Sequence, residues 1–227
     1  MMRQLHRTKQ ELVYEWLRDG IMSGEFAPGQ RLVIDEISRQ LGVSHIPVRE
    51  ALQTLHAERL VVTVPHMGVT VAPISTDLVI EVFSLMEGLE FVTMPIAAER
   101  FDADKRTSLR QHLATMDTAM LAGDAEQWAR LNSEFHQAIA HATGMAMLED
   151  MTERAIAQWE RVRRHYNVVA YRMETAQAEH HEIVAALERG DADTVRQLAI
   201  QHNRGAKGSY LAQIEASAAV AAGHQAS

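Results

Sequence analysis

Hydrophobic residues in the first third of the chain follow a helical spacing and then give way to two short β-rich runs. A first helix is expected over about residues 8–23, and its apolar residues form one stripe: Leu12, Val13, Trp16, Leu17 and Ile21. A turn at residues 24–30 leads to a short helix over about residues 34–41, which Gly42 ends. A third helix of about 14 residues follows, with Ser44 as its N-cap and Pro47 in its first turn.

Two β-rich segments come next, at residues 60–64 and 69–72, and the turn at residues 65–68 joins them as a hairpin. Three helices followed by a hairpin, within about 65 residues, predict a winged helix-turn-helix. Folds of this kind place the start of one helix in the major groove of DNA.

The rest of the chain is predicted to be helical throughout. No proline follows Pro95, and the segment is rich in Ala, Leu, Glu, Gln, Arg and Met, which are good helix formers. Five or six helices are expected between about residues 75 and 218, with Asp104, Asp124 and Asp191 at N-cap positions. The predicted fold is mainly α: a winged helix-turn-helix domain over residues 1–74 and an all-α antiparallel helical bundle over residues 75–227.

The amino-acid composition excludes several kinds of site and several classes of protein. The chain of 227 residues contains no cysteine, which excludes disulfides, thiolate metal sites and cysteine nucleophiles. No apolar run is long enough to span a bilayer and no apolar signal segment is visible, so we expect a cytoplasmic protein with no membrane partner. The net charge of -8 lies entirely beyond residue 72, because residues 1–72 hold eight basic and eight acidic side chains. A neutral N-terminal domain can still present a basic face to DNA.

The third helix carries the candidate DNA-reading residues. Val48, Leu52 and Leu55 form its buried stripe, which leaves His45, Ile46 and Arg49 pointing outward near its start. Arginine can bind guanine or a phosphate, and the free amides of a first helical turn can hold a phosphate. The alternative is a solvated surface. The candidate DNA-contacting residues are Arg31, Ser44, His45, Ile46, Pro47, Arg49 and Gly68, the last of which lets the hairpin tip approach the DNA backbone.

Three runs of sequence resemble the GntR transcription regulators: residues 20–32, residues 41–52 and residues 65–69. The helical second part resembles the FadR-type effector domain of that family, the FCD class. The resemblance implies a ligand-responsive DNA-binding transcription regulator of bacteria, a homodimer on a pseudo-palindromic operator. One position departs from the family, because His45 stands where an arginine that contacts DNA is usual, which implies a different operator or weaker binding.

Helical spacing turns several histidines of the second domain inward. His180 shares a face with Ile183, Val184 and Leu187, and His202 shares one with Val195 and Leu198. His136 lies on one face with Asn132, four residues earlier. Buried imidazoles are costly unless something satisfies them, and either hydrogen bonds in the core or a shared divalent metal would do so.

The family resemblance favours the metal. Many FCD domains carry Asp-x-x-x-His and two later histidines as ligands, and here these positions are Asn132, His136, His180 and His202. The donor types leave zinc, nickel and manganese undistinguished. The resemblance further implies that a small carboxylate effector binds beside the metal.

The family often has an arginine four residues before the glutamate of its first effector-domain helix. If that glutamate is Glu90, the position is Met86, which cannot bind a carboxylate. Arg161 and Arg164 are therefore the candidate effector-binding cations, with a solvated basic face as their alternative.

Two other functions compete with this prediction. The second domain could serve dimerisation alone, with structural histidines. A histidine-rich metal hydrolase would need an acid–base residue such as Glu134 or Glu179. The chain has no His-Glu-x-x-His motif, and we expect no enzyme.

Overall fold

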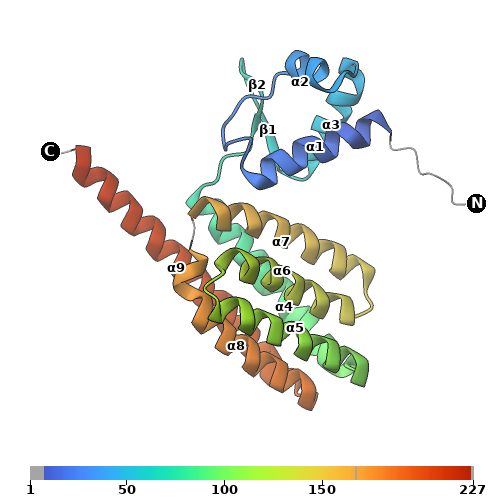
Figure 1. The fold of residues 1–227 in the computed structure, drawn as a ribbon, viewed down its shortest axis with the longest axis vertical. Coiled ribbons are helices and arrows are strands. Elements are labelled where there is room, and N and C mark those ends of the chain that lie inside the picture. Colours follow the sequence, from blue (N-terminus) through green and yellow to red (C-terminus); the bar gives the residue numbers. More distant parts are fainter. Residues whose placement is uncertain (1–7, 167, 226–227) are drawn as a thin grey trace, which may run out of the picture. The chain divides into compact units, whose positions relative to one another are not determined.

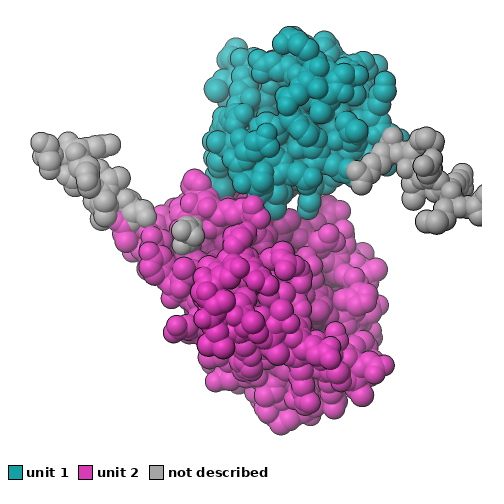
Figure 2. All heavy atoms as spheres, in the orientation of Figure 1, with its two compact units in different colours: residues 1–74 teal, residues 75–227 magenta. Residues whose placement is uncertain are grey.

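The computed structural model describes residues 8–166 and 168–225, with side chains described as far as residue 216. The chain divides between Ile74 and Ser75 into two compact units (Figure 2). Each unit has its own hydrophobic core.

Unit 1 is a winged helix-turn-helix, as predicted (Figure 1). Its elements run in the order α1 (Lys9–Ser23), α2 (Ile34–Leu41), α3 (His45–Ala57), β1 (Val61–Val64) and β2 (Gly68–Val71). The two strands pair antiparallel, in a register that runs from Val61 opposite Val71 to Val64 opposite Gly68. An isolated bridge between Arg31 and Thr70 attaches the segment before α2 to the hairpin.

The core of unit 1 forms where α1 packs on α3. Val13, Leu17 and Leu55 are completely buried. The predicted stripe on α1 was too wide, because Leu12 is 45% exposed. Only the residues that follow the spacing i, i+4 and i+8 from Val13 face α3, and Leu12 lies one position outside that row. Trp16 is half-buried and packs edge-on against Phe26, with ring centroids 5.0 Å apart.

Six helices make up the described part of unit 2. They are α4 (Thr76–Arg100), α5 (Ala103–Leu121), α6 (Ala125–Ala142), α7 (Ala146–Tyr166), α8 (Val169–Arg189) and α9 (Ala192–Gln225). Helix α4 packs along α9 and also contacts α6, α7 and α8, so it is the central helix of the bundle (Figure 1). No helix in the described ranges is long and apolar enough to cross a membrane.

Aspartates begin three of these helices. Asp124 and Asp191 cap α6 and α9 as predicted, since their Oδ1 atoms accept hydrogen bonds from the backbone amides of Gln127 and Thr194. The prediction for α5 was wrong by two residues. Asp102 is its cap and accepts a hydrogen bond from the amide of Lys105 at 2.8 Å. Asp104 lies in the first turn instead, where a negative charge also suits the helix dipole.

Candidate functional site

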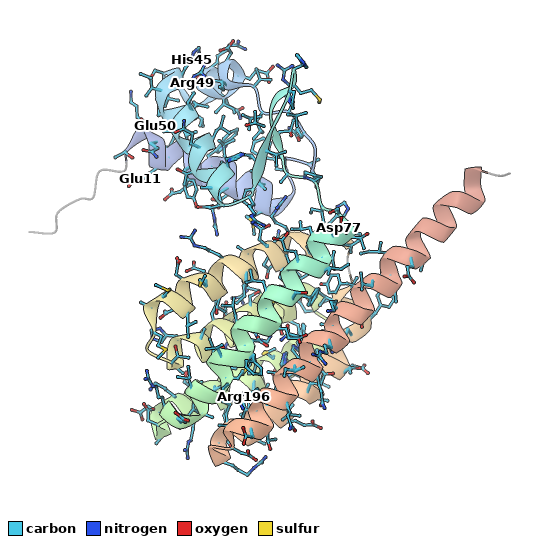
Figure 3. The ribbon with its side chains drawn as sticks, turned by 180° about the vertical axis from the view of Figure 1, so that it is seen from behind. Glu11, His45, Arg49, Glu50, Asp77 and Arg196 are labelled. Carbon is cyan, nitrogen blue, oxygen red and sulfur yellow. The ribbon has the colours of Figure 1, made fainter. Side chains whose placement is uncertain are left out.

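The start of α3 presents an open surface in unit 1. His45, Ile46 and Arg49 are exposed there, and His45 and Arg49 lie at the same end of the helix (Figure 3). The opposite face of the helix is held by Val48, Leu52 and Leu55, which are 0%, 4% and 0% exposed. The helix therefore offers its first turn outward because its apolar stripe anchors the other side.

Two other residues of the predicted DNA-contacting set are placed differently. Pro47 is buried, so it shapes the first turn of α3 from within and does not share the open surface. Ser44 is exposed at the N-cap position, but its side chain makes no capping hydrogen bond within the described chain. Its hydroxyl and the first-turn amides are thus available to an outside acceptor.

The remaining members of the set surround this surface. His45 Nε2 lies 3.1 Å from Asp35 Oδ1 at the start of α2. Arg31 is exposed and lies beside the hairpin, and Gly68 has a φ of 84°, in the left-handed region that favours glycine. All seven residues come from unit 1, and their contacts with DNA remain predictions.

In unit 2 the three predicted histidines meet. His136 on α6, His180 on α8 and His202 on α9 each offer one ring nitrogen, and these nitrogens all lie within 4.8 Å of one another. All three side chains are buried, at 4%, 0% and 6% exposure. Asn132 lies one turn before His136, is also buried, and its Oδ1 has no hydrogen-bond partner among the described residues.

Two carboxylates that the sequence did not single out as partners orient these rings. Glu90 Oε1 lies 2.5 Å from His136 Nδ1, and Glu179 Oε2 lies 2.6 Å from His202 Nδ1. In metal sites a carboxylate on one ring nitrogen fixes the ring and leaves the other nitrogen for the metal. His180 has no such partner: both of its ring nitrogens are buried without a hydrogen bond from any described residue.

The electrostatics keep His180 neutral. Burial is the main cause that lowers the pKa of His180 well below its usual value, and the neighbouring His202 and His136 lower it further. Burial by itself would raise the pKa of Glu90, but the neighbouring His136, His202 and Asn203 together outweigh it and the pKa falls. The cluster thus combines a neutral imidazole, ready to donate a lone pair, with an ionised carboxylate beside His136.

A cavity adjoins the histidines. It has about 450 Å³ of space not filled by protein, part of it open to solvent. Its polar lining consists of Asn132, His136, Arg172, His202 and Tyr210, and its apolar lining is Met86, Trp128, Trp159, Val168, Val169, Ala176 and Ala206. His180 lies beneath this lining, completely buried.

Comparison with known proteins decides the family. Residues 9–71 match the family model "Bacterial regulatory proteins, gntR family", and residues 81–205 match the FCD domain. The chain belongs to the GntR family and carries an FCD domain. It is a bacterial DNA-binding transcription regulator and not an enzyme, which also removes the hydrolase alternative.

Curated relatives and solved structures agree with this assignment. The chain is 28% identical over 199 residues to the HTH-type transcriptional repressor GlaR of Escherichia coli K12, covering 83% of this chain and 90% of GlaR. It is 30% identical over 137 residues to the regulator McbR of the same organism, covering 60% and 62%. The solved structure of E. coli McbR/YncC shares its fold, with a TM-score of 0.75 and 23% identity over 92% of this chain and 99% of that one.

Within this FCD domain, neither predicted effector-binding arginine reaches the cavity lining of the described residues. Arg161 is buried and donates a hydrogen bond to Gln158 Oε1 at 2.9 Å. Arg164 lies 3.5 Å from Glu126 and 3.8 Å from Glu160. Both lie late on α7, where acidic side chains of α6 and α7 surround the basic run. Met86 does line the cavity, and it stands at the family's arginine position if Glu90 is the family's glutamate.

The arginine at the cavity is Arg172, which sequence reasoning missed. Its Nη2 donates to both oxygens of Glu179, at 3.0 and 2.9 Å, and to the carbonyl oxygen of His202. A signal for it existed, because Arg172, Ala176 and His180 follow one another at four-residue intervals on α8. An arginine on the inward row of a histidine is a candidate for the same site.

Proposed function

We propose that this regulator binds its operator as a homodimer and that a small organic acid, held at a divalent metal in the FCD domain, changes its affinity for that operator. The observation that supports the metal best is His180. A completely buried imidazole with two unpartnered nitrogens carries a large desolvation cost. A metal ion bound to one of these nitrogens would offset it.

The residues present fit a metal. Asn132, His136, His180 and His202 would hold it with three imidazole nitrogens and one amide oxygen, a set suited to zinc, nickel or manganese. Glu90 and Glu179 orient two of the rings from behind. A bound cation would supply positive charge that attracts a carboxylate. Together with Arg172 it would leave the site net positive, since only two carboxylates adjoin the rings.

The acid-binding end of the FCD domain is connected to unit 1 through one helix. α4 begins at Thr76, directly after the segment that links the two units, and it carries both Met86 and Glu90. An acid that moves Glu90 or Met86 therefore acts on the helix that leads to the DNA-binding unit. Such an acid regulates only if it binds the DNA-competent and DNA-free states with different affinity.

Operator binding completes the proposal. We assign base and phosphate contacts to Arg49, His45 and Ile46 at the start of α3, with Ser44, Arg31 and Gly68 as supporting contacts. Two such surfaces are needed to read two half-sites, so the FCD domains would pair two chains. Because the operator lies on the chromosome, this action belongs in the cytoplasm.

The test combines metal and acid in one gel-shift series. Operator DNA is first selected from random sequence, and its binding is then measured with metal-loaded and chelator-stripped protein across a panel of organic acids. The proposal expects at least one acid to shift operator affinity of the loaded protein and to do nothing to the stripped protein. If no acid affects either form, or if both forms respond equally, the metal-dependent sensor is refuted.

In an alternative function, the FCD domain serves dimerisation alone and binds no metal. This alternative predicts identical operator affinity with and without chelator. The nitrogens of His180 have no partner among the residues that the structure describes, which favours the metal over this alternative, because a purely structural core histidine normally has a hydrogen-bond partner.

A further inference from the structure

The cavity beside the histidines has a mostly apolar lining with a few polar side chains. We infer that the effector is a monocarboxylate with a compact apolar body, whose carboxylate binds Arg172 while its body lies between Trp128, Trp159 and Met86. This inference rests on the proposed function and names the class of acid that the site takes.

Arg172 is built to receive one carboxylate. Its side chain is 10% exposed, its Nη2 is occupied by Glu179 and the carbonyl of His202, and its Nη1 has no partner among the described residues. Arg172 lines the cavity, and a carboxylate that reaches the buried Nη1 from there would supply the acceptor that this donor lacks. A buried guanidinium with one nitrogen fixed and the other free matches a single anionic group.

The position of this guanidinium is set by its neighbours. Glu179 holds it on one side and is itself hydrogen-bonded to His202. On α9, Gly205 makes room for it, since a Cβ there would lie 2.5 Å from Nη2. Arg172 thus lies next to a predicted metal ligand, since its Nη2 also donates to the carbonyl oxygen of His202.

The walls of the cavity select an apolar body. The polar atom of Trp128 is already used, because its Nε1 donates to Gln177 Oε1 at 2.9 Å. Its indole also stacks on His180, with ring centroids 5.8 Å apart. Val168, Val169 and Ala176 continue the apolar surface. Such a lining favours a hydrocarbon group over a polar one.

The same walls disfavour acids with more polar groups. Arg172 is the one arginine or lysine among the described lining residues, and Met86 offers no charge where the family often has arginine. A second carboxylate would lose its water without gaining a second cationic side chain of the described lining, and a row of hydroxyls would outnumber its two neutral polar side chains, Asn132 and Tyr210. Dicarboxylates and sugar acids are therefore poor ligands for this site.

The experiment is calorimetric titration of the metal-loaded full chain with five probes. Benzoate and 3-methylbutanoate carry one carboxylate on an apolar body, and benzamide is the neutral control. Succinate adds a second carboxylate, and gluconate adds hydroxyls. We expect the two apolar acids to bind at least tenfold more tightly than the other three probes.

Three variants tie this preference to named residues. Arg172→Met keeps the side-chain bulk and is expected to reduce benzoate affinity at least tenfold, while Arg204→Met, which removes an exposed arginine of α9, leaves it unchanged. Met86→Arg is expected to move the preference toward succinate. This gain of binding keeps the test informative if Arg172→Met fails to fold.

The outcomes separate the inference from the proposed function. If succinate or gluconate binds more tightly than benzoate to metal-loaded protein, the inference is wrong and the sensor function stands. If no acid binds although metal is present and operator binding is intact, both fail. Unchanged benzoate affinity in folded Arg172→Met would also overturn the inference.

Discussion

At the scale of single residues, His45 is the side chain that we expect to limit operator affinity. It is exposed at the start of α3, and its Nε2 lies 3.1 Å from Asp35 Oδ1, so the Asp35 carboxylate would compete with a DNA phosphate for the same ring. An arginine in its place would carry a permanent charge and a forked donor.

We therefore predict that His45→Arg increases operator affinity by about tenfold, the order expected of one good arginine contact. The steepness of its salt dependence should also rise by about one unit. The control is His56→Arg, the same substitution at the far end of α3. Fluorescence anisotropy at several salt concentrations measures both effects. Equal gains from the two variants would show only a general charge effect.

Glu90 is the second decisive residue, because it orients His136 and also accepts a hydrogen bond from Asn203. We predict that Glu90→Gln weakens metal affinity about 10–100-fold, the usual cost of losing a carboxylate behind a ligating histidine. Competition with a chromogenic chelator measures the dissociation constant. Glu87→Gln, which alters a half-buried carboxylate one turn earlier on α4 that pairs with Arg204, is the matched control and should leave the affinity unchanged.

The sequence predicted that the histidines face inward, but it did not predict that Glu90 and Arg172 lie beside them. The reason is geometric. His180 and His202 lie on apolar rows of their own helices, so their inward direction follows from a 3.6-residue period. Glu90 and Arg172 acquire their roles from neighbours on other helices, His136 and Asn203 in one case and the carbonyl of His202 in the other. Contacts between helices do not follow from the period of any one of them.

At the scale of elements, α9 carries two nearby glycines, and only one of them has room for a side chain. A Cβ at Gly208 would meet nothing within 4 Å, whereas a Cβ at Gly205 would clash with Arg172. Alanine at Gly208 should stabilise the protein by about 0.5–1 kcal/mol, because glycine is a poor helix former.

We predict that Gly208→Ala raises the melting temperature and that Gly205→Ala does not, since it must displace the guanidinium held by Glu179. Gly205→Ala should also weaken binding of the effector, while Gly208→Ala should not. Differential scanning calorimetry and ligand titration of the two variants check this. Equal stabilisation by both would mean that Arg172 moves freely and is not held for a ligand.

Element boundaries were predictable where local chemistry sets them. Helix α2 has the predicted range, because Gly42 ends it in the left-handed conformation with φ 64°. Helix α5 begins two residues before its predicted start, because Asp102 caps it and not Asp104. The exposure of Leu12 shows the limit of periodicity: the width of a buried stripe depends on how its partner helix packs.

At the scale of the whole molecule, the net charge is unevenly distributed along the chain. All of the net charge of -8 lies beyond residue 72, so the DNA-binding unit approaches DNA without net repulsion of its own. In the proposed operator complex one such unit would contact one half-site, so we expect two chains to pair on the operator.

We predict that the full chain sediments at twice the mass of one chain and binds a two-half-site operator far more tightly than either half alone. We expect a loss of at least about 100-fold on scrambling one half-site, because mismatches within a half-site cost about 1–3 kcal/mol each. Analytical ultracentrifugation and competition binding measure these quantities. If the chain is a monomer, or binds operators with one and two half-sites equally tightly, then operator binding by a dimer is contradicted.

The central claim is that the buried histidines hold a metal ion, and metal content tests it most directly. The protein is purified without a metal-chelating tag and analysed by mass spectrometry of its metals, beside His180→Gln and the neighbouring control His181→Gln, whose side chain is 52% exposed. We predict about one divalent ion per chain in the parent and in His181→Gln, and nearly none in His180→Gln. A folded parent protein that takes up no divalent ion, even when one is supplied in excess, would contradict the account.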